Sequence, residues 1–172
     1  MKMSIERIEL LGVPVDVCTK KDFEEKVIEL LESEKVSQVI FLSVWDLLKA
    51  RMKKKEYSKC VQEADLVVPV SKSIIWAAKV LKKTVPQRFN PFTTLISVMN
   101  ILDARYKSIY LLGGKKVSIT LAEKNVRSTF KGLHIVGRYI GAYQKAAEDA
   151  VVQAVFKSSP SFVLLSDGLR DK

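Results

Sequence analysis

The chain carries the segment Glu63-Ala-Asp-Leu-Val-Val-Pro-Val-Ser-Lys-Ser-Ile-Ile-Trp-Ala-Ala-Lys79, which joins a short strand directly to a helix. The apolar run Leu66–Val68 predicts a buried strand. Pro69 ends the ladder because proline has no N–H group to donate. Ser71 or Ser73 can then cap the following helix. The apolar residues of that helix recur at helical spacing and are Ile74, Ile75, Ala78 and Leu81.

The point where this strand meets its helix is the expected position of a ligand site. In α/β proteins the carboxyl end of a strand and the free N–H groups of the next helix converge there. We therefore expect a pocket around residues 70–73.

Strands and helices alternate along the rest of the sequence. Strands are predicted at 5–11, 13–17, 36–42, 108–112, 134–136 and 162–165. Helices are predicted at 20–33, 43–52, 73–83, 93–106, 117–130 and 144–158, with loops at 84–92 and 137–143. This order predicts an α/β fold, a Rossmann-like and mostly parallel sheet with helices on both faces and a short N-terminal β segment. We expect one domain over residues 1–172.

Local signals fix some of the helix ends. Thr19 and Ser43, the latter with Asp46 behind it, are predicted N-caps, and Gly132 is the predicted C′ residue of the helix that precedes it. The helix after Ser43 is expected to turn four apolar side chains inward and its lysines outward. These four are Val44, Leu47, Leu48 and Met52.

Composition narrows the class of protein. Of the 172 residues 48% are hydrophobic, which fits a globular protein with a real core. No apolar run approaches the roughly 20 residues of a membrane-spanning helix. The N-terminus lacks the apolar core of a signal peptide, so we expect a cytoplasmic protein. Cys18 and Cys60 show no metal-ligand spacing, and we expect reduced cysteines, no metal and no cofactor.

The charge is strongly basic, with 29 Lys and Arg against 19 Asp and Glu, a net charge of +10. Much of the excess lies in residues 49–59 and 79–88. Such clusters can face an anionic membrane surface, a polyphosphate ligand or, less favoured here, nucleic acid, and they also occur as solvated helix faces. A peripheral position at the inner face of the membrane is thus left open.

Five motifs, spread over most of the chain, resemble those of one family. They are Leu11-Gly-Val-Pro-Val-Asp16, Glu63-Ala-Asp-Leu-Val-Val-Pro69 with Ile74-Ile-Trp-Ala-Ala-Lys79, Pro86-Gln-Arg88, Tyr110-Leu-Leu-Gly-Gly114 and Gly132-Leu-His-Ile-Val-Gly137. In their order and spacing the chain resembles the WecG/TagA/CpsF family of bacterial glycosyltransferases. The resemblance implies transfer of an N-acetylhexosamine from a UDP-sugar to a polyprenyl-diphosphate-linked acceptor in cell-envelope polysaccharide synthesis.

The resemblance also shows where this sequence departs from the family. The family's presumed catalytic base is the Asp of a Pro-Asp-Gly turn, and Val70 stands there, followed by Ser71 in place of Gly. Where the family carries a Thr and an Asn, this chain has Leu42 and Val44. Because Val70 has no lone pair, it cannot accept a proton, a loss that typically removes ~10²–10⁴ in rate. The sequence favours a degenerate enzyme, a pseudoenzyme that retains UDP or UDP-N-acetylhexosamine binding.

Two other functions stay open. The first is an active transferase with a displaced base, for which Asp65 is the candidate, with Asp46 and Ser71 as further ones. Asp65 can equally anchor the start of its strand, whereas Asp46 and Ser71 fit capping positions. The second is a basic interaction module that binds anionic lipid or nucleic acid, with binding that falls as salt rises.

Further substrate contacts come from loops at strand ends. Gly113 and Gly114 precede a helix and can bind a diphosphate through backbone N–H groups, although most Gly-Gly pairs are simple turns. Arg88 can pair with a diphosphate or form a surface ion pair. Tyr143 can stack on a base or pack against its neighbours, as can Tyr139.

The C-terminal sequence departs from the family as well. Gly168-Leu-Arg-Asp-Lys172 does not match the family's Gly-x-Pro-Lys-Gln-Glu turn, so we expect the domain to lack the family's C-terminal segment. The sheet edge that such a loss exposes leaves a homo-oligomer open.

Overall fold

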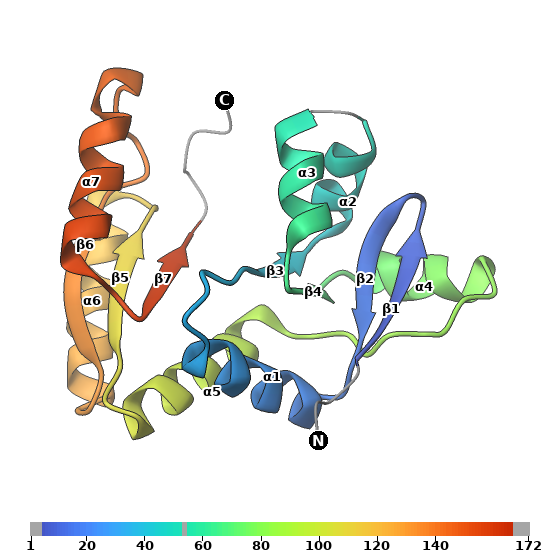
Figure 1. Cartoon of the computed structure of the whole chain (residues 1–172), viewed down its shortest axis with the longest axis horizontal. Helices are drawn as coiled ribbons and strands as arrows, with labels where there is room; N and C mark the ends of the chain where they lie inside the picture. Colours follow the sequence, from blue (N-terminus) through green and yellow to red (C-terminus); the bar gives the residue numbers. More distant parts are fainter. Residues whose placement is uncertain (1–4, 53–54, 167–172) are drawn as a thin grey trace. The chain divides into compact units, whose positions relative to one another are not determined.

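The computed structural model describes residues 5–52 and 55–166 (Figure 1). Outside them lie residues 1–4, Lys53 and Lys54 of the first basic cluster, and residues 167–172, which include the C-terminal mismatch with the family. The described part is a mixed α/β structure whose chain divides into two compact units, residues 1–97 and 98–172. Each unit is described by itself. The prediction of one domain remains a prediction.

Unit 1 opens with an antiparallel hairpin of β1 (Glu6–Leu10) and β2 (Val13–Val17). Leu11 and Gly12 form its two-residue turn, with φ of 55° and 82°. Positive φ at both positions is the signature of a type I′ turn, which matches the twist of the two strands. β2 packs beside the next sheet, so the hairpin belongs to the core of this unit.

The second sheet of unit 1 pairs β3 (Val39–Leu42) with β4 (Leu66–Pro69) in parallel. α2 (Val44–Arg51) and α3 (Lys55–Glu63) connect the two strands. α1 (Lys20–Glu32) precedes β3, and α4 (Lys72–Val80) follows β4. α5 (Pro91–Ala104) begins in unit 1 and ends in unit 2.

The core of unit 1 brings both sheets and their helices together. Phe23 of α1 lies 5.3 Å from Phe89 and 6.2 Å from Phe41 between ring centroids. A buried hydrophobic cluster draws on β1, β2, β3, β4 and the helices α2, α3 and α4. Its members include Leu10, Val13, Val15, Leu42, Leu47, Val61, Val67, Ile74 and Ala78.

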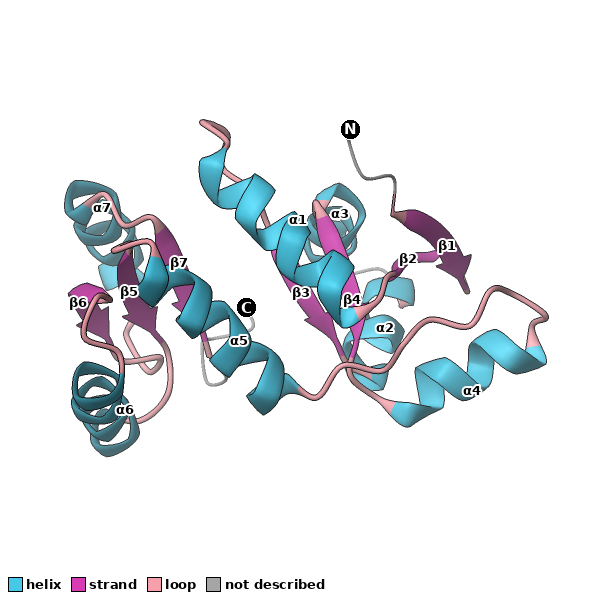
Figure 2. Ribbon diagram, turned by 90° about the horizontal axis from the view of Figure 1, so that it is seen from below, coloured by secondary structure: helices cyan, strands magenta, loops and turns pink. Residues whose placement is uncertain are grey.

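Unit 2 holds a parallel sheet in the order β6-β5-β7. Its strands are β5 (Ser108–Leu112), β6 (His134–Tyr139) and β7 (Phe162–Leu165). Helix α6 (Lys116–Thr129) and helix α7 (Glu148–Ser158), which follows a 3₁₀ turn at Lys145–Ala147, lie on opposite faces of this sheet (Figure 2). The α/β, Rossmann-like fold class is thereby confirmed.

Several predicted boundaries were wrong. α3 was missed altogether, because its polar residues outnumber the apolar ones. β3 is shorter than predicted, since its partner β4 offers only four residues for pairing, and Val36 is fully exposed. β6 extends to Tyr139, where a loop was predicted, because the neighbouring β5 continues to offer hydrogen-bond partners.

Some predicted inward-facing residues also face solvent. Met52 is 81% exposed because it follows the last residue of α2, and Ala50 takes the inward position beside Leu47. Leu81 is largely exposed because it caps the end of α4. Ser43 and Thr19 cap their helices as predicted, each in a complete capping box.

Gly132 is not the C′ residue that was predicted. α6 ends at Thr129, three residues before Gly132, and Gly132 does not adopt a positive φ. Its N–H donates to Asp103 Oδ1 at 2.6 Å, and a Cβ atom there would lie 2.4 Å from the carbonyl oxygen of Asp103. The glycine is therefore required by this close backbone approach.

Candidate functional site

The carboxyl end of β4 brings together three of the residues that the sequence singled out. The N–H of Val70 donates to the carbonyl of Leu42 at the end of the neighbouring strand, at 3.0 Å. Arg88 reaches back across the loop, and its Nε donates to the carbonyl oxygen of Val70 at 2.8 Å. The N–H of Phe89 donates to the carbonyl of Pro69 at 2.9 Å. The loop that carries Arg88 is thus fixed to the strand end.

Ser71 lies at the N-cap position of α4, but its side chain makes no capping bond, contrary to the prediction. Its Oγ instead accepts a hydrogen bond from the N–H of Val44 at 3.1 Å. That bond ties the first turn of α2 to the end of β4. The Ser71 hydroxyl therefore links α2 to the end of β4. The sequence alone could not show that these two elements are neighbours.

Two apolar residues line the end of the neighbouring strand. Leu42 is fully buried and belongs to the hydrophobic core, whereas Val44 is half-buried. Neither side chain offers a hydrogen-bonding atom to a sugar hydroxyl. This end of the parallel sheet therefore presents hydrocarbon side chains at both positions.

The two carboxylates considered as a displaced base both have backbone partners. Asp46 Oδ2 accepts from the N–H of Ser43 at 3.1 Å and from its hydroxyl at 2.5 Å, as part of the capping box. Asp65 Oδ2 accepts from the N–H of Gln38 at 2.8 Å, at the amino end of the sheet. A four-residue strand separates Asp65 from Val70, which puts their backbones roughly 16 Å apart. Its role as a base remains a hypothesis.

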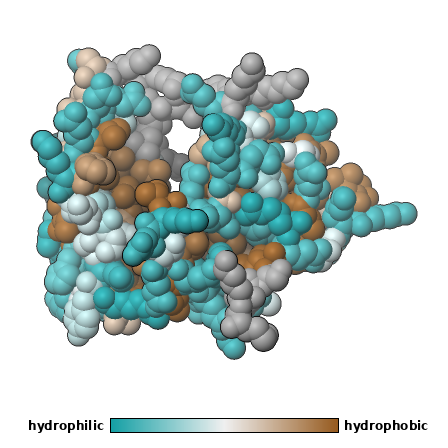
Figure 3. Space-filling model, viewed as in Figure 1, coloured by the Kyte–Doolittle hydropathy of each residue, from teal (hydrophilic) through white to brown (hydrophobic). Residues whose placement is uncertain are grey.

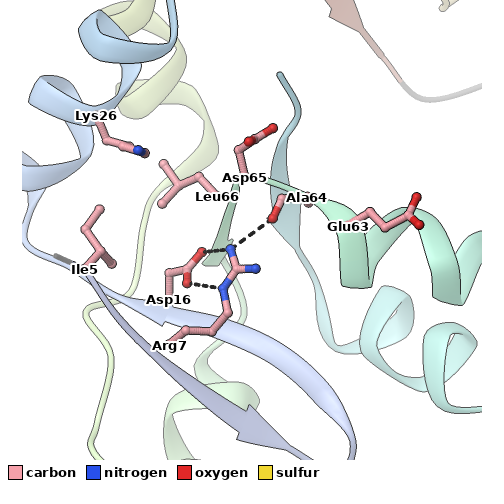
Figure 4. A pocket seen from close by; sticks show the side chains of 8 residues that line it. All are labelled: Ile5, Arg7, Asp16, Lys26, Glu63, Ala64, Asp65 and Leu66. Carbon is pink, nitrogen blue, oxygen red and sulfur yellow. Dashed lines mark hydrogen bonds and ion pairs between the residues drawn. The ribbon is translucent and has the colours of Figure 1, made fainter. Parts of the chain in front are cut away.

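The amino end of the same sheet carries a pocket of about 420 Å³, lined by charged side chains (Figure 4). At its base the guanidinium of Arg7 binds the carboxylate of Asp16 in a bidentate pair, with Nε–Oδ1 and Nη2–Oδ2 distances of 2.7 and 2.8 Å. Arg7 Nη2 also donates to the carbonyl of Ala64, and Asp16 Oδ2 accepts from the N–H of Val67 at 2.6 Å. The hydrogen bond to Asp16 raises the pKa of Arg7 above its usual value.

This ion pair fastens the N-terminal hairpin to β4. Asp16 is 3% exposed, and no other charged side chain among the described residues is as deeply buried. Basic and acidic groups are nearly balanced around the pocket, where Lys26 already pairs with Glu29 at 3.0 Å. Sequence reasoning noted Asp16 only within a motif. The available signal was a carboxylate in the middle of an apolar strand, which requires a partner.

In unit 2 the Gly-Gly pair lies at the carboxyl end of β5, as predicted. Gly113 and Gly114 have φ of 120° and 68°, which favours glycine at both. The N–H of Gly113 donates to the carbonyl of Tyr139 at 3.0 Å, and the carbonyl of Gly114 accepts from the N–H of Gly141 at 3.0 Å. A Cβ at Gly113 would lie 2.5 Å from the Oγ of Ser166. The N–H of Gly113 is therefore already used by the fold.

Tyr143 lies beside this turn through an aromatic contact. Its ring centroid is 5.9 Å from that of Tyr139, with the two planes at 73°. Such an edge-to-face pair is a common packing contact. Gly113, Gly114 and Tyr143 thus gather in unit 2, whereas Val70, Ser71 and Arg88 gather in unit 1.

Comparison with known proteins gives the family. The chain matches the profile of the glycosyl transferase WecG/TagA/CpsF family over residues 8–172. It belongs to this family. A similar protein is the N-acetylglucosaminyldiphosphoundecaprenol N-acetyl-beta-D-mannosaminyltransferase of Bacillus spizizenii, with 23% identity over 117 residues. That match covers 68% of this chain and 45% of the relative, so the chain matches less than half of the relative's length.

Membership in the WecG/TagA/CpsF family gives the strand end of unit 1 its significance. The family motif that resembles residues 63–79 carries the presumed catalytic aspartate where this chain has Val70. Asp65 and Asp46, the two carboxylates considered as a displaced base, are each engaged as described above. In this family member the side chain at that position, Val70, contains no proton acceptor.

The described residues include two free cysteines, Cys18 and Cys60. No group of three or more His, Cys, Asp or Glu side chains in this part of the chain is arranged to hold a metal ion. Cys18 is buried and unpaired, and burial raises the pKa of its thiol to about 12, with smaller contributions from Asp16 and Asp22. A thiol with that pKa stays protonated at neutral pH and is a poor nucleophile.

None of the described helices combines the length and the apolar composition that a transmembrane segment requires.

Proposed function

We propose that this WecG/TagA/CpsF family member is a degenerate glycosyltransferase of cell-envelope polysaccharide synthesis that binds UDP-N-acetylhexosamine but does not transfer the sugar. The observation that carries the proposal is the place of Val70, at the carboxyl end of β4 beside a parallel strand. A ligand bound at this strand end would meet a hydrocarbon at the position of the family's base. General-base catalysis needs an acceptor within hydrogen-bond reach, and valine has none.

Retained binding is supported by the order of the loop around Arg88. Its Nε is fixed to the carbonyl of Val70, which holds the guanidinium at the strand end. The terminal pair of guanidinium nitrogens has the spacing that matches two oxygens of a phosphate. α4 also begins there without a side-chain cap, so its first N–H groups favour an anion.

The name of the relative supports a proposal for the class of acceptor. The name of the Bacillus spizizenii protein states a diphosphoundecaprenol-linked acceptor and an N-acetylmannosaminyl group. We propose that the present protein acts on the same pathway class at the cytoplasmic surface of the membrane, as a binding protein and not as a transferase.

Calorimetric titration of the full chain with UDP and with UDP-N-acetylhexosamines tests the binding. We expect saturable binding by the wild type and at least tenfold weaker binding by Arg88→Met, which keeps the length of the side chain but removes the fork. Lys124→Met, an exposed change in unit 2, serves as the control and should leave the affinity unchanged. No heat of binding at millimolar ligand would refute the retained site.

A product assay on a polyprenyl-diphosphate-linked acceptor tests the loss of transfer. We expect no product above background from the wild type. Turnover that Asp65→Asn abolishes would refute the proposal and would establish Asp65 as a displaced base. Turnover that survives Asp65→Asn would refute it as well and would direct attention to Asp46.

A further inference from the structure

The outward face of α4 combines an exposed tryptophan with an exposed aliphatic side chain and lysines. Trp76 is 68% exposed and Val80 is 57% exposed, one helical turn apart. The opposite face buries Ile74 and Ala78 in the core of unit 1, so the helix is held in place and cannot turn Trp76 inward. Hydrophobic side chains reach the surface among hydrophilic ones at several places, including the end of unit 1 that α4 occupies (Figure 3).

The charge around Trp76 is of one sign. Residues 72–88 contain no Asp or Glu and five basic residues, namely Lys72, Lys79, Lys82, Lys83 and Arg88. Lys72 and Lys79 lie one turn before and after Trp76 on the same helix face. Among the described acidic side chains, Glu6 contacts this segment, where it accepts a hydrogen bond from Thr84 at 2.9 Å.

The C-terminal end of α4 is fixed by backbone hydrogen bonds. Lys82 adopts a left-handed conformation with φ of 52°, and the N–H of Lys83 donates to the carbonyl of Ala78 at 3.0 Å. This pairing closes the helix as a Schellman motif does. The turn that follows the helix is therefore ordered, with Leu81 43% exposed at its start.

We propose that this α4 face, defined as Lys72, Trp76, Lys79 and Val80 together with Lys83 just after the helix, docks on an anionic phospholipid surface. Tryptophan favours the boundary between headgroups and acyl chains, because its ring is apolar and its N–H is polar. Lysines beside it can extend their ammonium groups to the lipid phosphates while their stems cover apolar surface.

Two other apolar surfaces are less suited to an anionic membrane. Trp45 on α2 is 72% exposed and basic residues follow at the end of the same helix, but Asp46 lies directly after Trp45 and α3 carries Glu56 and Glu63. Phe156 on α7 is 82% exposed, but that helix begins with acidic residues. The α4 face is favoured because attraction to anionic lipid requires cations without neighbouring carboxylates.

Docking through α4 has a consequence that rests on the proposed function. α4 begins directly after Ser71, at the strand end where the sugar nucleotide is proposed to bind. A membrane-bound α4 would hold that strand end next to the headgroups. A lipid-linked diphosphate has its polar part at the same depth.

The two tryptophans of the chain make a direct test possible, since each can be kept alone. Trp45→Phe leaves Trp76 as the reporter, and Trp76→Phe leaves Trp45. Full-length proteins are mixed with vesicles of phosphatidylglycerol and phosphatidylcholine that contain brominated acyl chains, and with vesicles of phosphatidylcholine alone. We expect Trp76 to shift to the blue and to be quenched on anionic vesicles only, while Trp45 keeps its emission.

Charge variants provide an independent measurement. Lys79→Glu/Lys83→Glu should weaken vesicle sedimentation at least tenfold. Lys124→Glu/Lys157→Glu is the matched control. Each Lys→Glu change lowers the net charge by two, so both double variants go from +10 to +6. The control should bind within about twofold of the wild type, since its lysines lie on α6 and α7.

The proposal is overturned if Trp45 is quenched as strongly as Trp76, if both charge variants weaken binding equally, or if neutral vesicles bind as well. It is also overturned if sedimentation shows a dimer that Trp76→Ser dissociates, because a second copy would then cover the face. Titration of the same variants with UDP-sugar separates the two proposals. A wild type that binds UDP-sugar but not anionic vesicles refutes the docking alone, and one that binds the vesicles but not UDP-sugar refutes the proposed function alone.

Discussion

The buried pair of Arg7 and Asp16 should be one of the most sensitive points of unit 1. Arg7→Met removes the two hydrogen bonds to Asp16, of 2.7 and 2.8 Å, and the one to the carbonyl of Ala64. It leaves a carboxylate that is 3% exposed with one N–H partner, that of Val67. Breaking a buried pair by removing one partner typically costs ~3–5 kcal/mol, because the remaining charge is uncompensated. We expect a loss of unfolding free energy in that range.

Removing the charge of Asp16 should lower the free energy of unfolding by less than removing Arg7. In Asp16→Asn the remaining guanidinium of Arg7 is 38% exposed and can turn toward water, so we expect a loss of about 1–3 kcal/mol. The double variant contains no buried charge, and its loss should fall short of the sum by about 2 kcal/mol. That shortfall is the coupling energy of the pair.

Urea unfolding measures these differences, and tryptophan emission reports on unit 1 because Trp45 and Trp76 both lie there. The control cycle is Lys21→Met with Glu25→Gln, an i,i+4 pair at 3.7 Å whose side chains are 84% and 49% exposed. Its coupling should be below about 0.5 kcal/mol. Additive losses at Arg7 and Asp16, within about 0.5 kcal/mol, would refute the reasoning that this pair holds the hairpin to β4.

Three further predictions rest on single contacts. Gly113→Ala should lower the unfolding free energy by more than about 2 kcal/mol, whereas Gly12→Ala, where the added Cβ meets open space, should cost about 1 kcal/mol. Circular dichroism in urea compares the two variants. Equal losses would contradict the close approach of Gly113 to Ser166. Ellman's reagent at pH 8 should modify Cys60 and spare Cys18 until the protein unfolds, because the pKa of Cys18 is raised to about 12. The protonated form of Cys18 therefore contributes stability that is full below about pH 8.5, the usual thiol pKa, and is lost as the pH rises toward 12. Ser43→Ala should remove the capping box of α2 and cost about 1 kcal/mol, and an unchanged urea midpoint would count against it.

The sequence was most informative where a signal is local. Capping boxes at Thr19 and Ser43 were correct because a cap depends on residues three positions apart. The strands at 108–112 and 162–165 were placed to the residue, because each apolar run is bounded by polar residues. α3 escaped because its polar residues mask the apolar spacing that supports it.

Side-chain partners distant in the sequence were beyond that kind of reasoning. Ser71 satisfies every local criterion for an N-cap, yet its hydroxyl binds the N–H of Val44, which lies 27 residues earlier. Gly132 likewise follows a helix as a C′ residue does, but Asp103 determines why it is glycine. Such choices depend on which elements become neighbours.

By itself the amino-acid sequence determined the α/β class, the family and the replacement of the expected aspartate by Val70, because each depends on the order of residues along the chain. Only the tertiary structure decided that Arg88 is fixed to the carbonyl of Val70, that Asp65 accepts from the N–H of Gln38, and that Arg7 and Asp16 form a buried pair. These contacts join residues that lie 9 to 27 positions apart in the sequence. They exist because burial brings polar groups to places where only another part of the chain can satisfy them.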